Sequence, residues 1–230
     1  MKVMKFGGTS VGKPQRMKEV AQLIASSEEP KIVILSALSG TTNALVEISN
    51  LLAVNDRRTA REKIDALQAS YVVFIKELLA DETLLAKARA VLTEHFEFLQ
   101  IILKISFSEA LNKDILAQGE LLSTKLFSLY LEEIKVPHKL LPALDFMTLD
   151  THDEPQVGTI KVKLAQQLQR NLDITIFITQ GFITRNAKGE VDNLKRGGSD
   201  YTASLIAAAI NASKNTLNRM IISRYSVCPI

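Results

Sequence analysis

The sequence predicts an α/β fold of three layers, in which a mainly parallel sheet lies between helices. Three short apolar runs, 3–6, 31–36 and 174–179, are bounded by glycine, proline or polar residues, as buried central strands are. Helical periodicity separates these runs, and the first is followed by a glycine turn, a helix and the second strand. That order is a βαβ unit, which implies parallel strands joined by a right-handed crossover.

The first helices follow from periodicity and from capping residues. Residues 14–27 place apolar side chains at helical spacing, with Pro14 in the first turn. From about residue 42 to 131 the sequence has helical periodicity and contains no proline, so we expect a long helical insertion there. Asn-Asp at 55–56 and Asp-Glu at 81–82 are the expected caps between its helices.

The alternation of strand and helix resumes after Pro137. Residues 138–144 are expected to form a strand and residues 157–172 a helix. A β-hairpin should follow, with strands at 182–185 and 190–194 around an Asn-Ala-Lys-Gly turn. A single α/β unit of 230 residues is ordinary, so we expect one domain.

The bulk properties exclude several classes of function. The net charge of +3 comes from dispersed basic residues and forms no stripe of the kind that binds nucleic acid. The single Cys228 excludes an intrachain disulfide, and the three histidines lack metal-ligand spacing, so no protein metal site is expected. No apolar stretch approaches the roughly 20 residues that span a bilayer. We therefore expect a soluble, cytoplasmic protein with no nucleic-acid or membrane partner, in which His95 is structural.

Two glycine-rich turns are the candidate anion sites. KFGGTSVG at residues 5–12 follows the first predicted strand, and RGGSD at residues 196–200 begins a predicted helix. Arg196 offers a planar fork to a carboxylate or phosphate, and the neighbouring glycines let backbone N–H groups approach a ligand closely. Two anion cradles in one chain indicate phosphoryl transfer to an anionic acceptor.

The first turn matches a P-loop poorly. Gly7, Gly12 and Lys13 satisfy G-x-x-x-x-G-K, but Pro14 stands where a P-loop needs a hydroxyl for magnesium. Nor does the turn fit the dinucleotide pattern G-x-G-x-x-G. The remaining interpretation makes Lys5, at the carboxyl end of the first strand, the cation that neutralises a transferring phosphoryl group. The alternative is a surface lysine beside a structural turn.

Four motifs together resemble the aspartokinases, a branch of the amino acid kinase family, in their order and spacing. They are KFGGTSVG at 5–12, LSALSGTTN at 35–43, QGELLS at 118–123, and QGFI at 180–183 followed by RGGSDYTA at 196–203. The resemblance runs from residue 1 to about 213, and its first and last motifs are the most specific. It implies the amino acid kinase-like, or carbamate kinase-like, fold. It also implies transfer of the ATP γ-phosphate to the side-chain carboxylate of L-aspartate, the first step towards lysine, threonine and methionine.

The resemblance also implies a role for each site residue, with ATP and Mg²⁺ as cofactors. The implied residues are Lys5 and Asp200 for catalysis; Lys5, Gly7, Gly8 and Ser36 for ATP; and Thr42, Glu120, Arg196 and Ser199 for aspartate. Lys5 would contact the transferring phosphoryl group, and Asp200 would orient Lys5 or magnesium. Glu120 would pair with the α-ammonium group of the substrate. The nucleophile needs no general base, because a carboxylate with a pKa near 3.9 is already ionised at neutral pH.

Each of these interpretations has a structural alternative. Ser36, Thr42 and Ser199 could simply cap helices. Glu120 could be an acid on a helix surface, and Asp200 could be a first-turn residue that interacts favourably with the helix dipole.

The resemblance is lost after residue 213, where an aspartokinase would continue into a strand ending in Thr-Asp and a glycine turn. Residues 214–230 do not match, although 220–223 could form a strand. We therefore expect an incomplete catalytic domain without regulatory ACT domains, the product of truncation or frame-shift, with weak activity or none.

Two other functions stay open. One is an amino acid kinase with a different acceptor, and the other is a non-catalytic remnant that binds a metabolite. The sequence does not decide whether the chain forms a homo-oligomer.

Overall fold

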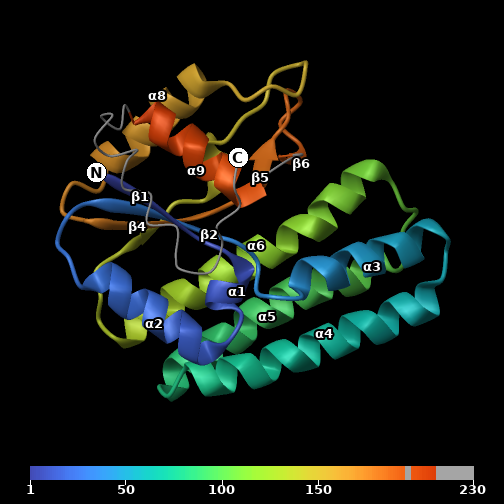
Figure 1. Ribbon diagram of the computed structural model, residues 1–230. Coiled ribbons are helices and arrows are strands. Elements are labelled where there is room, and N and C mark those ends of the chain that lie inside the picture. The colour runs from blue at the N-terminus through green and yellow to red at the C-terminus, as the bar shows by residue number, and fades with distance from the viewer. Residues whose placement is uncertain (195–197, 211–230) are drawn as a thin grey trace.

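A four-stranded parallel sheet forms the centre of the computed structural model, which describes residues 1–194 and 198–210 (Figure 1). Its strands are β1 (Lys2–Phe6), β2 (Lys31–Leu35), β3 (Lys139–Leu140) and β4 (Ile176–Gln180). Their order is β1-β2-β4-β3, and all three neighbouring pairs are parallel. Helices cover both faces of this sheet (Figure 1), which confirms the expected three-layer α/β fold.

Nine helices are seen in the described part of the chain. They are α1 (Gly8–Val11), α2 (Pro14–Ala25), α3 (Thr41–Ala53), α4 (Arg57–Leu78), α5 (Glu82–Ile102), α6 (Glu109–Glu133), α7 (Ala143–Phe146), α8 (Val157–Gln169) and α9 (Gly198–Ala209). Side chains alternate between the two faces of a strand. Val33 and Ile178 therefore pack into the core made with α2 to α6, whereas Ile32 and Phe177 pack into the core made with α7 to α9.

The helices α3 to α6 occupy the stretch in which the sequence predicted only helices. Both expected caps are present, because Asp56 accepts a hydrogen bond from the Thr59 amide at 3.1 Å and Asp81 accepts one from the Leu84 amide at 2.9 Å. Ser108, which the sequence analysis did not single out, caps α6. Among the helices that the structure describes, none is both long and apolar enough to cross a membrane.

One strand prediction was largely wrong. Of residues 138–144 only Lys139–Leu140 form a strand, and α7 begins at Ala143. Pro142 has no N–H for a strand ladder, and the Ala143 amide donates instead to Gln180 Oε1 at 2.7 Å.

The predicted hairpin is present as β5 (Ile183–Arg185) and β6 (Val191–Asn193), which pair antiparallel. Gly189 in its turn has a φ of +81°, a conformation that glycine adopts without strain. His95 is structural, as expected, because it is buried and its Nδ1 lies 2.5 Å from Gln118 Oε1. The strand suggested at 220–223 lies outside the described residues.

Candidate functional site

The candidate site lies at the carboxyl edge of the parallel sheet. Phe6, Leu35 and Gln180 end β1, β2 and β4, and they pair in register across the three strands. The segments that follow these strands therefore begin side by side, although they are far apart in the sequence. The carboxyl edge is where open parallel sheets bind ligands.

Lys5 and Asp200 meet at this edge. Lys5 Nζ lies 3.0 Å from Asp200 Oδ1, and the two side chains are 17% and 66% exposed. Asp200 belongs to the first turn of α9, where a carboxylate also interacts favourably with the helix dipole. The ion pair joins the first sequence motif to the last and leaves much of the Asp200 carboxylate open to solvent.

Two serines link the loop after β2 to α9. Ser36 Oγ donates to Ser199 Oγ at 2.9 Å, and Ser123 on α6 donates its hydroxyl to the Ser36 carbonyl at 2.8 Å. Ser36 does not cap α3, because the capping residue of that helix is Gly40. Ser199 packs tightly on Gly181, where an added Cβ atom would lie 2.3 Å from Ser199 Oγ. Gly181, directly after β4, thus packs against Ser199, whose hydroxyl accepts the hydrogen bond from Ser36.

Glu120 is a buried acid on α6, 3% exposed, so the helix-surface alternative is wrong. Its Oε1 accepts a hydrogen bond from the Ala37 amide at 3.3 Å, whereas its Oε2 is buried without a hydrogen-bond partner. Burial raises the pKa of Glu120 to about 7, against 4.5 for an ordinary glutamate. A carboxyl group in this state can take up either a proton or a cationic ligand.

Thr42 is exposed in the first turn of α3 and does not cap that helix. Its neighbour Thr41 was not predicted to matter, but Thr41 is buried and its Oγ1 lies 3.0 Å from the Tyr71 hydroxyl. The structure therefore fixes the start of α3 through Thr41 and presents Thr42 at the surface beside it.

Three glycines let neighbouring segments approach the loop 36–40 closely. A Cβ atom added to Gly8 would lie 2.8 Å from the Ala37 carbonyl oxygen, and one added to Gly119 would lie 2.8 Å from the Ala37 Cβ. At Gly12 an added Cβ would lie 2.5 Å from the Ser39 Cβ. At Gly7 the nearest atom to an added Cβ is Lys5 Nζ, at 3.4 Å. Gly8 is therefore also a packing residue, a role that the sequence motif did not reveal.

Further contacts at this edge were not predicted, although Gln180 and Phe182 belong to the fourth motif. Gln180 donates from Nε2 to Thr124 Oγ1 at 2.7 Å, and Thr124 donates to the Glu120 carbonyl at 2.9 Å, which ties β4 to α6. Phe182 has a φ of +68°, and its amide donates to Thr202 Oγ1 at 2.9 Å. The fourth motif includes Phe182 but does not predict this conformation, because only tertiary contacts force a non-glycine residue into it.

Arg196 and Gly197 lie outside the described residues. The described chain on either side of them meets at Phe182, however. The Leu194 amide donates to the Phe182 carbonyl at 2.8 Å, and a Cβ atom added to Gly198 would lie 3.4 Å from Phe182 Cδ2. Both ends of the segment that carries Arg196 are therefore anchored where β4 ends.

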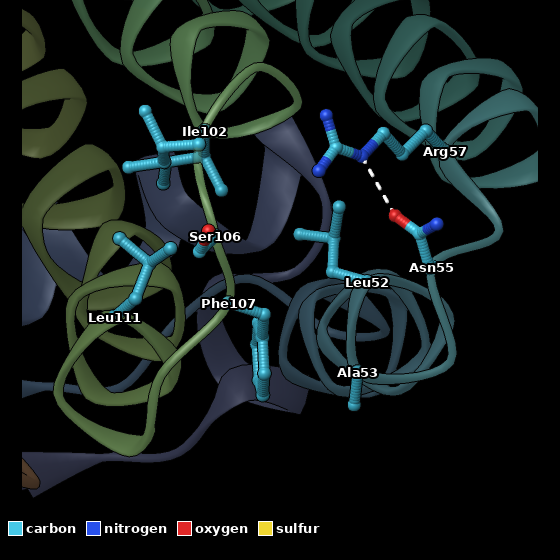
Figure 2. A pocket seen from close by; sticks show the side chains of 9 residues that line it. Leu52, Ala53, Asn55, Arg57, Ile102, Ser106, Phe107 and Leu111 are labelled. Atoms are coloured by element: carbon cyan, nitrogen blue, oxygen red, sulfur yellow. Dashed lines mark hydrogen bonds between the residues drawn. The ribbon is translucent and has the colours of Figure 1, made fainter.

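A pocket of about 280 Å³ lies elsewhere, between the ends of α3 and α5 and the starts of α4 and α6 (Figure 2). Leu52, Phe107 and Leu111 form its apolar wall, and Arg57 donates from Nε to Asn55 Oδ1 at 2.9 Å at its rim. No residue predicted for the site lines this pocket, so it is separate from the carboxyl edge of the sheet.

The sequence was compared with those of known proteins. Residues 1–217 match the model of the amino acid kinase family. The chain is 34% identical over 217 residues to the lysine-sensitive aspartokinase 3 of Escherichia coli K12, covering 92% of this chain and 47% of that protein. It is 35% identical over 216 residues to the aspartokinase of Chlamydia trachomatis, covering 91% and 46%.

Solved structures show the same relationship. Escherichia coli aspartokinase III in complex with aspartate and ADP superimposes with a TM-score of 0.76 at 31% identity, covering 90% of this chain and 46% of that one. The chain thus spans about half the length of the relatives that it matches. Because the family match extends over nearly the whole sequence, this chain belongs to the amino acid kinase family.

Proposed function

We propose that residues 1–230 form part of the catalytic domain of an aspartate kinase, in which the helices between about 42 and 131 are an insertion. The enzyme would transfer the γ-phosphate of ATP to the side-chain carboxylate of L-aspartate and release 4-phospho-L-aspartate and ADP. The observation that supports this best is the Lys5–Asp200 ion pair at the edge where Glu120 is also buried. The similarity to an aspartokinase that binds aspartate and ADP supports the same reaction.

The reaction requires neutralisation of charge repulsion between the reactants rather than a general base. The acceptor carboxylate is ionised at neutral pH, but it must approach a triphosphate of the same sign. In the proposal Lys5 neutralises the phosphoryl group during transfer, and Asp200 holds the Lys5 ammonium in place. The 3.0 Å contact supports this division of roles, because Lys5 is oriented before any substrate binds.

Phosphate oxygens of ATP would be held by the turn after β1 and by the loop after β2. The proposed groups are the backbone amides of Gly7 and Gly8 and the hydroxyl of Ser36. Mg²⁺ usually keeps several waters and binds substrate phosphates with one or two carboxylates. Asp200 fits that requirement, since its side chain is 66% exposed. The ion would supply positive charge to the phosphates.

The acceptor would be recognised by groups matched to each end of aspartate. Glu120 is the proposed partner of the α-ammonium, because its Oε2 is buried without a partner and a cation would relieve the cost of ionising it. Arg196, Thr42 and Ser199 are the proposed partners of the carboxylates. We also propose a cytoplasmic location, because a single cysteine suits a reducing compartment.

The test combines binding with turnover. Calorimetry should show binding of L-aspartate and much weaker binding of L-glutamate, N-acetylglutamate and UMP. In a version of the enzyme extended to the length of its relatives, ADP release with MgATP should be fast with aspartate and much slower with the other three acceptors. In the kinetic assay Arg196→Ala should mainly raise the KM for aspartate, and Lys5→Ala should mainly lower kcat. Equal heats for aspartate and N-acetylglutamate would contradict the role of Glu120 and the proposed acceptor.

A further inference from the structure

The buried hydroxyl of Thr202 joins the first turn of α9 to the chain that leaves β4. Thr202 is fully buried, and its Oγ1 accepts a hydrogen bond from the Phe182 amide at 2.9 Å. The same hydroxyl donates to the Gly198 carbonyl at 3.2 Å. A bond from a threonine hydroxyl to the carbonyl four residues earlier is common within helices. The bond from Phe182 is different, because it links the helix to a segment 20 residues away in the sequence.

The partner of Thr202 is held in an unfavourable backbone conformation. Phe182 has a φ of +68°, and across it the Ile183 amide donates to the Gly181 carbonyl at 2.7 Å, which makes a γ-turn. A positive φ at the centre of a γ-turn is the rare, strained form. A non-glycine residue stays in such a conformation only where the surrounding structure requires it. By accepting the Phe182 amide, Thr202 helps to fix the turn that follows β4.

The turn of α9 that Thr202 anchors carries two residues of the candidate site. Ser199 and Asp200 lie between Gly198 and Thr202 in the first turn of the helix. Asp200 reaches Lys5 on β1, with 3.0 Å between its Oδ1 and the lysine Nζ. Because the bond from Thr202 to Gly198 spans this turn, it acts on the backbone from which Asp200 projects.

Apolar packing holds α9 on the sheet but constrains its first turn less. The helix lies beside α8 on one face of the sheet (Figure 1) and packs there through residues such as Ala203 and Ile206. Apolar packing is non-directional, whereas a hydrogen bond has a preferred distance and angle. The bond from Phe182 therefore adds a constraint on the position of α9 along its axis. Gly181 also packs closely against Ser199, so small shifts of the turn are felt at the end of β4.

A second link between the same elements competes with ligands under the proposed function. Ser36 Oγ donates to Ser199 Oγ at 2.9 Å, but both hydroxyls are proposed to bind substrates. The Thr202 hydroxyl is buried away from the surface, so its two hydrogen bonds do not compete with a ligand. Thr202 can therefore anchor the turn in the free and the occupied site alike.

We propose that Thr202 is a positioning residue for the Lys5–Asp200 ion pair. Its hydroxyl holds the first turn of α9 on the turn after β4, and so sets where the Asp200 carboxylate meets the Lys5 ammonium. Thr202 touches no ligand and acts through Asp200. The inference rests on the proposed function where it assigns catalysis to this pair, whereas the anchor itself does not depend on the reaction.

Acylation of lysine side chains in this chain, without ligand, tests whether Thr202 sets the ion pair. Lys5 is 17% exposed and paired with Asp200, which shields it from a reagent such as N-hydroxysuccinimidyl acetate. In Thr202→Val, which removes the hydroxyl and keeps the shape, site-resolved mass spectrometry should show Lys5 reacting about threefold faster, the scale of one lost coupled contact. Thr202→Ser, which keeps the hydroxyl, should react as wild type does. A wild-type rate at Lys5 in Thr202→Val would overturn the proposal.

Two controls separate this effect from a general loosening of the fold. Ser204→Ala removes the bond from the Ser204 hydroxyl to the Asp200 carbonyl at 3.2 Å, which is local to α9, and should leave the Lys5 rate unchanged. Lys125, in an exposed ion pair on α6, is the internal reference and should react equally in every variant. An equal rise at Lys5 and Lys125 in Thr202→Val would indicate general loosening and would also overturn the proposal.

A double variant tests whether Thr202 acts through Asp200. Asp200→Asn alone should raise the Lys5 rate, because the ion pair is lost. Adding Thr202→Val to Asp200→Asn should raise it no further, since the partner that Thr202 positions is already gone. A further rise as large as that of Thr202→Val alone would show that Thr202 acts on Lys5 by another route, contrary to the proposal.

Kinetics of a version of the enzyme extended to the length of its relatives test the consequence for catalysis. Thr202→Val should lower kcat about tenfold, while Thr202→Ser and Ser204→Ala stay close to wild type. An unchanged kcat for Thr202→Val in an active enzyme would overturn the proposal. If the extended wild type does not phosphorylate aspartate but acylation of Lys5 responds as expected, the proposed function is wrong and the positioning of the ion pair by Thr202 is supported.

Discussion

Replacing Glu120 by glutamine should stabilise the folded protein above neutral pH, because the variant no longer has to ionise a buried carboxyl group. Glutamine keeps an oxygen that can accept the hydrogen bond of the Ala37 amide, and it does not titrate. The change therefore alters charge at this position with little alteration of shape.

The size and sign of the effect follow from the two pKa values. The carboxyl group has a pKa of about 7 in the folded protein and 4.5 in an ordinary environment. Between these values the folded state holds a proton that the unfolded state releases. Stability is therefore fully present below the unfolded pKa, falls as pH rises through the window and stays lower above it. At about 1.4 kcal/mol per pKa unit, the loss amounts to about 3 kcal/mol.

Urea unfolding between about pH 4 and pH 9 measures this effect as the difference in free energy of unfolding between Glu120→Gln and wild type. As pH rises from 4.5 to about 7, the free energy of unfolding of the variant should increase by about 3 kcal/mol relative to that of wild type. Burial also lowers the pKa of His95, but both proteins retain this residue, so its contribution to the difference cancels. Glu97→Gln, which replaces an exposed glutamate on α5, is the matched control.

Two results would refute the reasoning. A free-energy difference that does not change with pH would show that Glu120 ionises normally in the folded protein. A difference that falls as pH rises would mean that the ionised carboxylate is favoured by the fold, contrary to its burial without a cation.

Three further predictions concern the same edge and the core. If Glu120 binds the α-ammonium in its ionised form, the dissociation constant of aspartate should fall as pH rises towards about 7 and then level off. Calorimetry from pH 5 to 8 checks this. A dissociation constant that does not change with pH would contradict it. Gly119→Ala places a Cβ atom 2.8 Å from the Ala37 Cβ, so it should cost about 1–3 kcal/mol of stability by overpacking and weaken aspartate binding. Lys31→Met removes hydrogen bonds to the carbonyls of Ile24 and Ser27, so urea unfolding should show a loss of about 1–3 kcal/mol, and an unchanged midpoint would contradict it.

Much of the fold was predictable because local signals agree with tertiary structure. β1, β2 and β4 are short apolar runs, and α4 and α5 begin at aspartate caps that are visible in the sequence. The failure at 138–144 has a tertiary cause, because the side chain of Gln180 captures the Ala143 amide and lets α7 begin there. A sequence window around 140 contains no information about Gln180.

The candidate site was predictable only in part, for a similar reason. The motifs named Lys5, Asp200, Ser36 and Ser199, and the structure brings these four residues together in two contacts. The sequence could not show which helix lies beside the hairpin, so it did not predict the ion pair between Lys113 on α6 and Asp192 in β6. The roles assigned to the site residues stay predictions, and Arg196 lies outside the described residues.

The strand order has a consequence for folding kinetics. β2 and β4 are hydrogen-bonded neighbours, with Leu35 paired to Gln180, although α3 to α6 lie between them in the sequence. Those helices contact one another in succession, so they can assemble from short-range contacts, whereas the β2–β4 ladder requires closure of a very long loop. We therefore expect the helical block to form early and the carboxyl edge to be completed last. Substitutions that slow assembly of the helices would then delay the appearance of ligand binding, even where they touch no ligand.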